Sequence, residues 1–142
     1  MSNHLCVDKI IAISETVSFF QGLIESSNKT PSALFMRIQA RRVQKGQEPK
    51  TYRQISKEDQ DAFLYNLEQV LYTYLNCFEF ARLTIDYEPM YLLYHAVETA
   101  NLSDKAFFIH RTMPWKTSVI ISKDSVRLRK DNIEMPVIWL NQ

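Results

Sequence analysis

The spacing of apolar residues changes from a helical period to a strand period near residue 103, and this change constrains the fold most. Before it, apolar residues recur every three or four positions, as they do along one side of a helix. After it, short β-branched and aromatic runs alternate with turn residues, which is typical of strands. The order predicts a single α+β domain over residues 1–142, with about four N-terminal helices followed by a small C-terminal antiparallel sheet of three to four strands.

The four expected helices have recognisable boundaries. The first covers roughly residues 5–25, and the second begins at Thr30-Pro31, a good cap followed by a proline that fits the first turn, and stops near Gly46. Ser56 caps the third, which is apolar nearly all round from residue 71 to 83 and is therefore expected to be central and buried. The fourth covers roughly residues 88–101. The stripe of the first helix is formed by Cys6, Ile10, Ile13, Val17, Phe20 and Ile24, and that of the second by Leu34, Phe35, Ile38 and Val43.

The expected strands lie at residues 106–109, 118–121, 126–129 and 136–140, separated by polar turn segments. Pro136 suits an edge strand or the first residue of a strand, because proline cannot donate a ladder hydrogen bond.

Several chemistries are excluded by what the chain lacks. Its two glycines, Gly22 and Gly46, are too far apart to build a glycine-rich phosphate loop. The two cysteines, Cys6 and Cys77, and three scattered histidines do not have the paired spacing of a zinc site. We expect no cofactor and no metal, and we interpret both cysteines as buried free thiols. No export signal and no membrane-spanning run are visible, which predicts a cytoplasmic protein without a membrane partner.

The net charge of +1 conceals strongly separated blocks of charge. Residues 29–57 hold eight basic residues and one acidic residue, for a net charge of +7. Residues 58–104 hold one basic and nine acidic residues, for a net charge of −8. Residues 1–28 carry −2 and residues 105–142 carry +4.

Two interpretations of the basic block compete. In one, it is a docking surface for an acidic protein or for nucleic-acid phosphates. In the other, the second helix packs antiparallel to the third, so that Arg41 and Arg42 meet Glu58, Asp59 and Asp61 as surface pairs worth roughly 0–1 kcal/mol each.

Candidate catalytic and metal groups are weak. His110 and Arg111 could serve as a base and an anion clamp for a small phosphodiester-acting enzyme, but neighbours on a strand point to opposite faces. Cys77 and His95 could form a nucleophile and base, yet their apolar surroundings favour packing. Glu79, Asp86 and Glu88 could hold a hard cation, although their spacing fits no calcium loop and a capped helix start is the simpler account.

The sequence therefore favours recognition over reaction, and its many tyrosines, which protein interfaces enrich, agree. We expect a small non-catalytic binding protein that acts on a protein partner, of the inhibitor, immunity or antitoxin-like, or regulatory type. The alternative is a nucleic-acid-binding regulator that uses the basic segment from Arg37 to Lys57. The expected contact residues are Arg37, Arg41, Arg42, Lys45, Tyr52 and Arg53.

Overall fold

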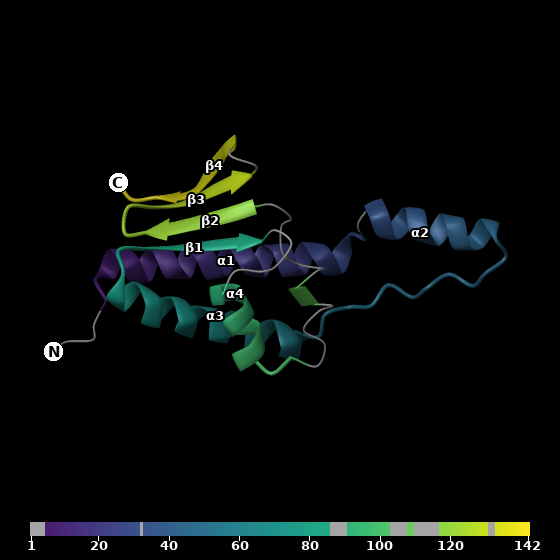
Figure 1. Cartoon of the computed structure of the whole chain (residues 1–142), viewed down its shortest axis with the longest axis horizontal. Coiled ribbons are helices and arrows are strands. Elements are labelled where there is room, and N and C mark those ends of the chain that lie inside the picture. The colour runs from purple at the N-terminus through teal and green to yellow at the C-terminus, as the bar shows by residue number, and fades with distance from the viewer. Residues whose placement is uncertain (1–4, 32, 86–90, 103–107, 110–116, 131–132) are drawn as a thin grey trace.

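A computed structural model describes residues 5–31, 33–85, 91–102, 108–109, 117–130 and 133–142. The elements with their bounds are α1 (Val7–Lys29), α2 (Ala33–Gln44), α3 (Lys57–Cys77), β1 (Phe80–Ile85), α4 (Tyr91–Thr99), β2 (Thr117–Ser122), β3 (Ser125–Lys130) and β4 (Ile133–Leu140). Figure 1 shows the sheet on one side of α1, with α3 and α4 on the other. The α+β class, the leading helices and the antiparallel sheet are confirmed.

The two long helices, α1 and α3, pack against each other through apolar rows. On α3 the buried residues fall at every fourth position, so they line one side of the helix. Ser56 caps α3 as predicted, because its side-chain oxygen accepts a hydrogen bond from the Asp59 N–H at 3.1 Å. The buried row of α3 contains Phe63, Leu67, Leu71 and Leu75, and that of α1 contains Ala12, Ile13, Thr16, Phe20 and Ile24.

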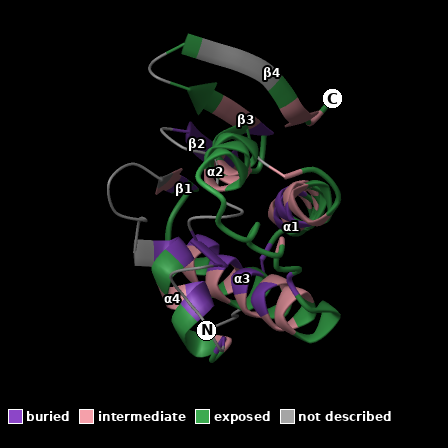
Figure 2. Ribbon diagram, turned by 90° about the vertical axis from the view of Figure 1, so that its right-hand side faces the viewer, coloured by how far each residue is buried: buried purple, intermediate pink, exposed green. Residues whose placement is uncertain are grey.

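The sheet is a four-stranded antiparallel meander in the order β1-β2-β3-β4. Strands β2, β3 and β4 contact α1, whereas β1 contacts α3 and α4. Leu83, Val119 and Leu128 lie opposite one another on successive strands and form one inner row. In Figure 2, buried residues gather where α3, α4 and the sheet meet, whereas the edge at β3 and β4 is more exposed. Pro136 lies in β4, an edge strand, as predicted.

An aromatic chain lies at the centre of the core. The Phe63 ring lies 4.8 Å from that of Phe108 and 6.2 Å from that of Phe20, measured between centroids, and all three are almost fully buried. Aromatic pairs in such tilted and edge-to-face arrangements add to the stabilisation that burial alone provides. One side chain of α3 therefore joins α1 to the short buried turn at residues 108–109.

The predicted continuation of the third helix to residue 83 is wrong. The helix ends at Cys77, and residues 80–85 form strand β1. Along β1 exposed and buried residues alternate: Phe80 and Arg82 are exposed, whereas Ala81 and Leu83 are buried. This two-residue period is that of a half-buried strand and cannot place one side of a helix against the core.

Two further predicted elements differ. The strand predicted at residues 106–109 is wrong in its described part, because Phe108 and Ile109 form a short, buried helical turn. The fourth helix is α4, Tyr91–Thr99, and the predicted start at residue 88 lies outside the described residues. The other three predicted strands correspond to β2, β3 and β4.

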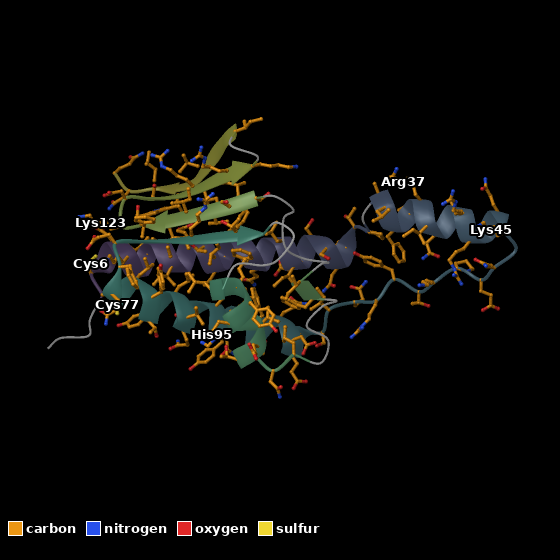
Figure 3. All side chains as sticks on the ribbon, viewed as in Figure 1. Cys6, Arg37, Lys45, Cys77, His95 and Lys123 are labelled. Atoms are coloured by element: carbon orange, nitrogen blue, oxygen red, sulfur yellow. The ribbon has the colours of Figure 1, made fainter. Side chains whose placement is uncertain are left out.

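Both cysteines are exposed free thiols, so the prediction that they are buried is wrong. Cys6 precedes α1 and Cys77 ends α3, and Figure 3 shows both at the same end of the molecule. Between them, Lys9 donates hydrogen bonds from Nζ to the carbonyl oxygens of Leu75 (2.9 Å) and Phe78 (3.2 Å). A cation at the end of a helix satisfies its free carbonyls and complements its dipole.

Candidate functional site

The segment of residues 30–56, which we call the arm, projects from the end of the molecule opposite the two cysteines (Figures 1 and 3). It consists of α2 and an irregular return segment that leads back to α3. In the part of the chain that the structure describes, α2 packs against no other helix and no strand, and none of its residues is buried. Of the net charge of +7 over residues 29–57, the arm itself carries +5, because Lys29 and Lys57 lie at its two ends.

The base of the arm is held closed by hydrogen bonds. The Asn28 side chain donates from Nδ2 to the Ile55 carbonyl at 3.0 Å and accepts from the Ile55 N–H at Oδ1 at 2.8 Å. The Gln60 amide donates to the same carbonyl at 3.0 Å. The Tyr52 hydroxyl donates to the Ser27 carbonyl oxygen. Because Ile55 is buried in the core, the point where the arm leaves the body is fixed.

The return segment packs along one side of α2. The Phe35 and Tyr52 rings meet edge to face with centroids 4.9 Å apart. The Arg42 Nε donates to the Glu48 carbonyl at 2.8 Å. The Gln39 Oε1 accepts from the Lys50 N–H at 2.6 Å. These contacts give α2 a covered side and make the arm a small unit of its own.

Gly46 ends α2, as the sequence predicted. The Gly46 N–H donates to the Val43 carbonyl at 3.0 Å, and the Gln47 N–H donates to the Arg42 carbonyl at 2.9 Å. This pair of bonds is the Schellman arrangement, which places the residue after the cap in the left-handed region. Gly46 has the required φ of +72°.

The six predicted contact residues all lie on the arm, but not all are equally accessible. Arg37, Arg41 and Lys45 are exposed on α2 or directly after it, and Figure 3 shows Arg37 and Lys45 at the far end of the molecule. Arg53 is exposed on the return segment. Arg42 and Tyr52 are half-buried, and their contacts with the return segment and the base hold the arm together.

Three side chains of α2 that the sequence placed on a packed side are exposed, and so is Met36. Leu34 is 61% exposed, Ile38 44%, Val43 59%, and Met36, which was not singled out, 55%. Only Phe35 of the expected stripe finds partial cover, against Tyr52. Covering one such side chain completely contributes about 2 kcal/mol, more than a typical exposed ion pair. These are the site residues that sequence analysis missed.

The alternative in which the second helix packs on the third is wrong. α2 makes no contact with α3, and no ion pair joins Arg37, Arg41 or Arg42 to a carboxylate among the described residues. Lys57 and Asp61, two exposed side chains of α3, form an ion pair with each other at 3.0 Å. Arg37 and Arg41 thus face solvent, whereas Arg42 contacts the return segment.

A stripe of acidic residues and tyrosines runs along α3. We call Glu58, Asp61, Tyr65, Glu68 and Tyr72 the acidic stripe; they recur at steps of three and four and so share one side of the helix. Glu58, Asp61, Tyr65 and Glu68 are exposed, and Tyr72 is half-buried. Beside the stripe, between α1 and α3, lies a cavity of about 310 Å³. Its lining residues are Ile10, Ile13, Ser14, Val17, Ser18, Glu68 and Tyr72.

The outer face of the sheet is a second basic surface that sequence analysis did not single out. Arg82 and Arg127 lie in one cross-strand row on either side of Ile120, and Arg129 is opposite Ser118 in the next row. Arg82 donates from Nη2 to the Ser118 hydroxyl at 3.3 Å. The signal was hidden because Arg82 was assigned to a helix.

The candidate catalytic groups are not brought together where the structure describes them. His110 and Arg111 lie outside the described residues, as do Asp86 and Glu88. Cys77 is exposed at the end of α3, whereas His95 lines a cavity of about 300 Å³ between α3 and α4 to which Cys77 does not contribute. Among the described residues, no group of three or more histidine, cysteine or acidic side chains could hold a metal ion.

None of the described helices is both long and apolar enough to cross a membrane. Comparison with protein-family models, curated proteins and solved structures finds no match to this chain. The function therefore has to be inferred from the arm, the acidic stripe and the sheet.

Proposed function

We propose that this chain is a non-catalytic binding protein that uses the arm to occupy an acidic surface of a protein partner. The observation that carries the proposal is the combination on α2 of exposed basic residues with exposed aliphatic ones, on a helix that no other described helix or strand contacts. Leu34, Arg37, Ile38, Arg41 and Lys45 fall within about 100° of the helix circumference, and we call them the docking face.

Magnitudes favour a protein over a nucleic acid as the partner. Burial of Leu34 and Ile38 against a partner supplies affinity, at about 2 kcal/mol for each side chain that is completely buried. The arginines around them set orientation and choice of partner more than affinity. A phosphate backbone pairs with the guanidinium groups but gives aliphatic side chains little to pack against.

A comparison of two double variants tests the proposal. Arg37→Ala with Arg41→Ala removes charge from the docking face, whereas Arg129→Ala with Lys123→Ala removes the same charge from β3 and the β2–β3 turn. All four side chains are exposed, so both variants should unfold within about 0.5 kcal/mol of the wild type.

The partner is isolated on the tagged wild-type protein from the source cell, purified, and titrated against all three proteins. We expect the Kd to rise about tenfold or more for the arm variant and to stay unchanged for the sheet variant. Equal affinities for the wild-type protein and the arm variant would contradict the proposal. A large loss of stability in the arm variant would show that these arginines are internal supports.

The nucleic-acid alternative gives a different result in a salt titration. An oligonucleotide of about 30 nucleotides that bound through phosphate contacts would show log K falling steeply and linearly with log salt. The second basic surface at Arg82, Arg127 and Arg129 makes this control necessary. Tight binding of this kind, abolished by the arm variant, would replace the protein partner with a nucleic acid.

A further inference from the structure

We infer that the partner of the docking face is a second copy of this chain. In the resulting homodimer, α2 of each copy packs along the acidic stripe of the other. The inference rests on the proposed function, because it names a partner for the same arm. It is carried by three relationships between the arm and the body of the chain: residue spacing, charge, and the fixed base of the arm.

The two helical surfaces have the same spacing. On the arm, Leu34, Ile38, Arg41 and Lys45 lie at steps of four, three and four residues. On α3, Asp61, Tyr65, Glu68 and Tyr72 repeat the same steps. Residues at these steps form one ridge along a helix, so two such ridges can run side by side for about three turns.

The chemistry of the two ridges is complementary in one direction. Within one chain α2 and α3 run in opposite directions (Figure 1), so a two-fold axis across the long dimension makes α2 of one copy parallel to α3 of the other. The ridge positions then pair in order: Ile38 meets Tyr65, Arg41 meets Glu68 and Lys45 meets Tyr72, with Leu34 at Asp61 at the end of the contact. Cations pack well on tyrosine rings, and an opposite charge beside an apolar contact fixes its register.

The exposed charges of the two surfaces are opposite. Arg37, Arg41 and Lys45 belong to the docking face, whereas Glu58, Asp61 and Glu68 belong to the acidic stripe, and a reciprocal pair forms the contact between them twice. A contact of this kind is isologous, with the same two surfaces contributed by both copies, as in most two-fold dimers.

The base of the arm keeps α2 away from its own acidic stripe. Asn28, Gln60 and the core residue Ile55 fix the point of exit by three hydrogen bonds. Tyr52 bonds across to Ser27. The arm therefore points outward from the end of α1 (Figure 1), and the complementary surface has to come from another molecule.

Complementary charge reversal tests this inference. One variant carries Arg41→Glu and Lys45→Glu, and the other carries Asp61→Lys and Glu68→Lys. Sedimentation equilibrium of the full chain should give a wild-type mass of twice 16.7 kDa. Each variant alone should weaken self-association by about 100-fold, because like charges then meet across the contact.

The decisive result is the mixture of the two variants. In the heterodimer both contacts again join opposite charges, so an equimolar mixture should regain the dimer mass. A control that carries Lys123→Glu and Arg129→Glu changes the same amount of charge on the sheet and should dimerise like the wild type. Circular dichroism melting of each variant confirms that it is folded before its mass is interpreted.

Two outcomes would overturn the inference. One is a wild-type protein that stays monomeric up to about 100 μM, well above the Kd of an ordinary micromolar interface. The other is a dimer that both variants form as tightly as the wild type. Either outcome would refute self-association through the arm, but the proposed function would stand if a different protein still bound through Arg37 and Arg41. If the wild-type protein neither self-associated nor bound another protein through the arm, both proposals would fail.

Discussion

Asn28 and Ile55 lie 27 residues apart in the chain, and one side-chain amide of the first satisfies both backbone groups of the second. The amide pairs with the N–H and the carbonyl of Ile55 as the backbone of a neighbouring strand would. This pairing lies where the arm begins and ends. The arm's position depends on this pair and on the burial of Ile55, because α2 itself has no buried residue.

Replacing Asn28 with alanine should therefore destabilise the protein. The Ile55 N–H loses its side-chain acceptor in a buried position, and an unpaired buried donor costs about 1–3 kcal/mol. Urea unfolding followed by circular dichroism measures the loss. The same substitution at Asn76, which is exposed on α3, should change the free energy of unfolding by less than about 0.5 kcal/mol. Equal effects at both positions would show that the base is held by other contacts.

The two glycines should respond to alanine with opposite signs. Gly46 has a φ of +72°, where a side chain costs roughly 1–2 kcal/mol, although no atom lies within 4 Å of the added Cβ. Gly22 lies inside α1 with the same open space, and alanine is favoured there by about 1 kcal/mol.

Hydrogen exchange of α2 amides and urea unfolding separate these two effects. Gly46→Ala should speed exchange along α2, and Gly22→Ala should raise the free energy of unfolding. Slower exchange in α2 after Gly46→Ala would show that the turn does not need the left-handed conformation.

Truncation of Phe63 should remove a large part of the stability. This ring bridges Phe20 and Phe108 in the centre of the core, and Phe→Ala at such positions costs about 3–5 kcal/mol. Phe80 is 61% exposed on β1, so Phe80→Ala is the matched control and should be nearly neutral. If Phe63→Ala does not fold, Phe63→Leu retains most of the volume and provides a measurable loss. A core centred elsewhere would be indicated by equal costs at Phe63 and Phe80.

Both thiols should react in the folded protein. Cys6 and Cys77 are exposed, so a thiol-specific chromogenic reagent should titrate two equivalents per chain without denaturant. Cys6→Ser and Cys77→Ser should each remove one equivalent. Reactivity that appears only after unfolding would restore the expectation of buried thiols drawn from the sequence.

The body of the fold was predictable where periodicity was long and uninterrupted. α1, α3 and the last three strands were anticipated because each has a repeated apolar side or a clear turn at its ends. β1 was missed because no glycine or proline separates it from α3, and its first residues continue the apolar pattern of the helix. The alternation from Phe80 to Leu83 was the available signal.

The site was predictable as a charge pattern but not as a surface. The block of basic residues identified the segment that projects as the arm. The aliphatic residues of that segment, Leu34, Ile38 and Val43, were expected on a covered side of α2 but are exposed. An amphipathic stripe indicates which side of a helix favours burial, not which element buries it. Cys6 and Ile10 have the spacing of the α1 stripe and are nevertheless exposed, whereas Leu5, next to Cys6, is buried in the core.

The close approach of Asn28 and Ile55 at the base marks a place where one segment of the chain can be exchanged for another. Because the chain leaves and re-enters the body at neighbouring points, residues between them can be excised or grafted without changing how α1, α3 and the sheet meet. Insertions and deletions between these two points would change the length or the sequence of the arm and leave the rest of the molecule unchanged. A change of recognition specificity then needs only the replacement of one contiguous stretch of the gene.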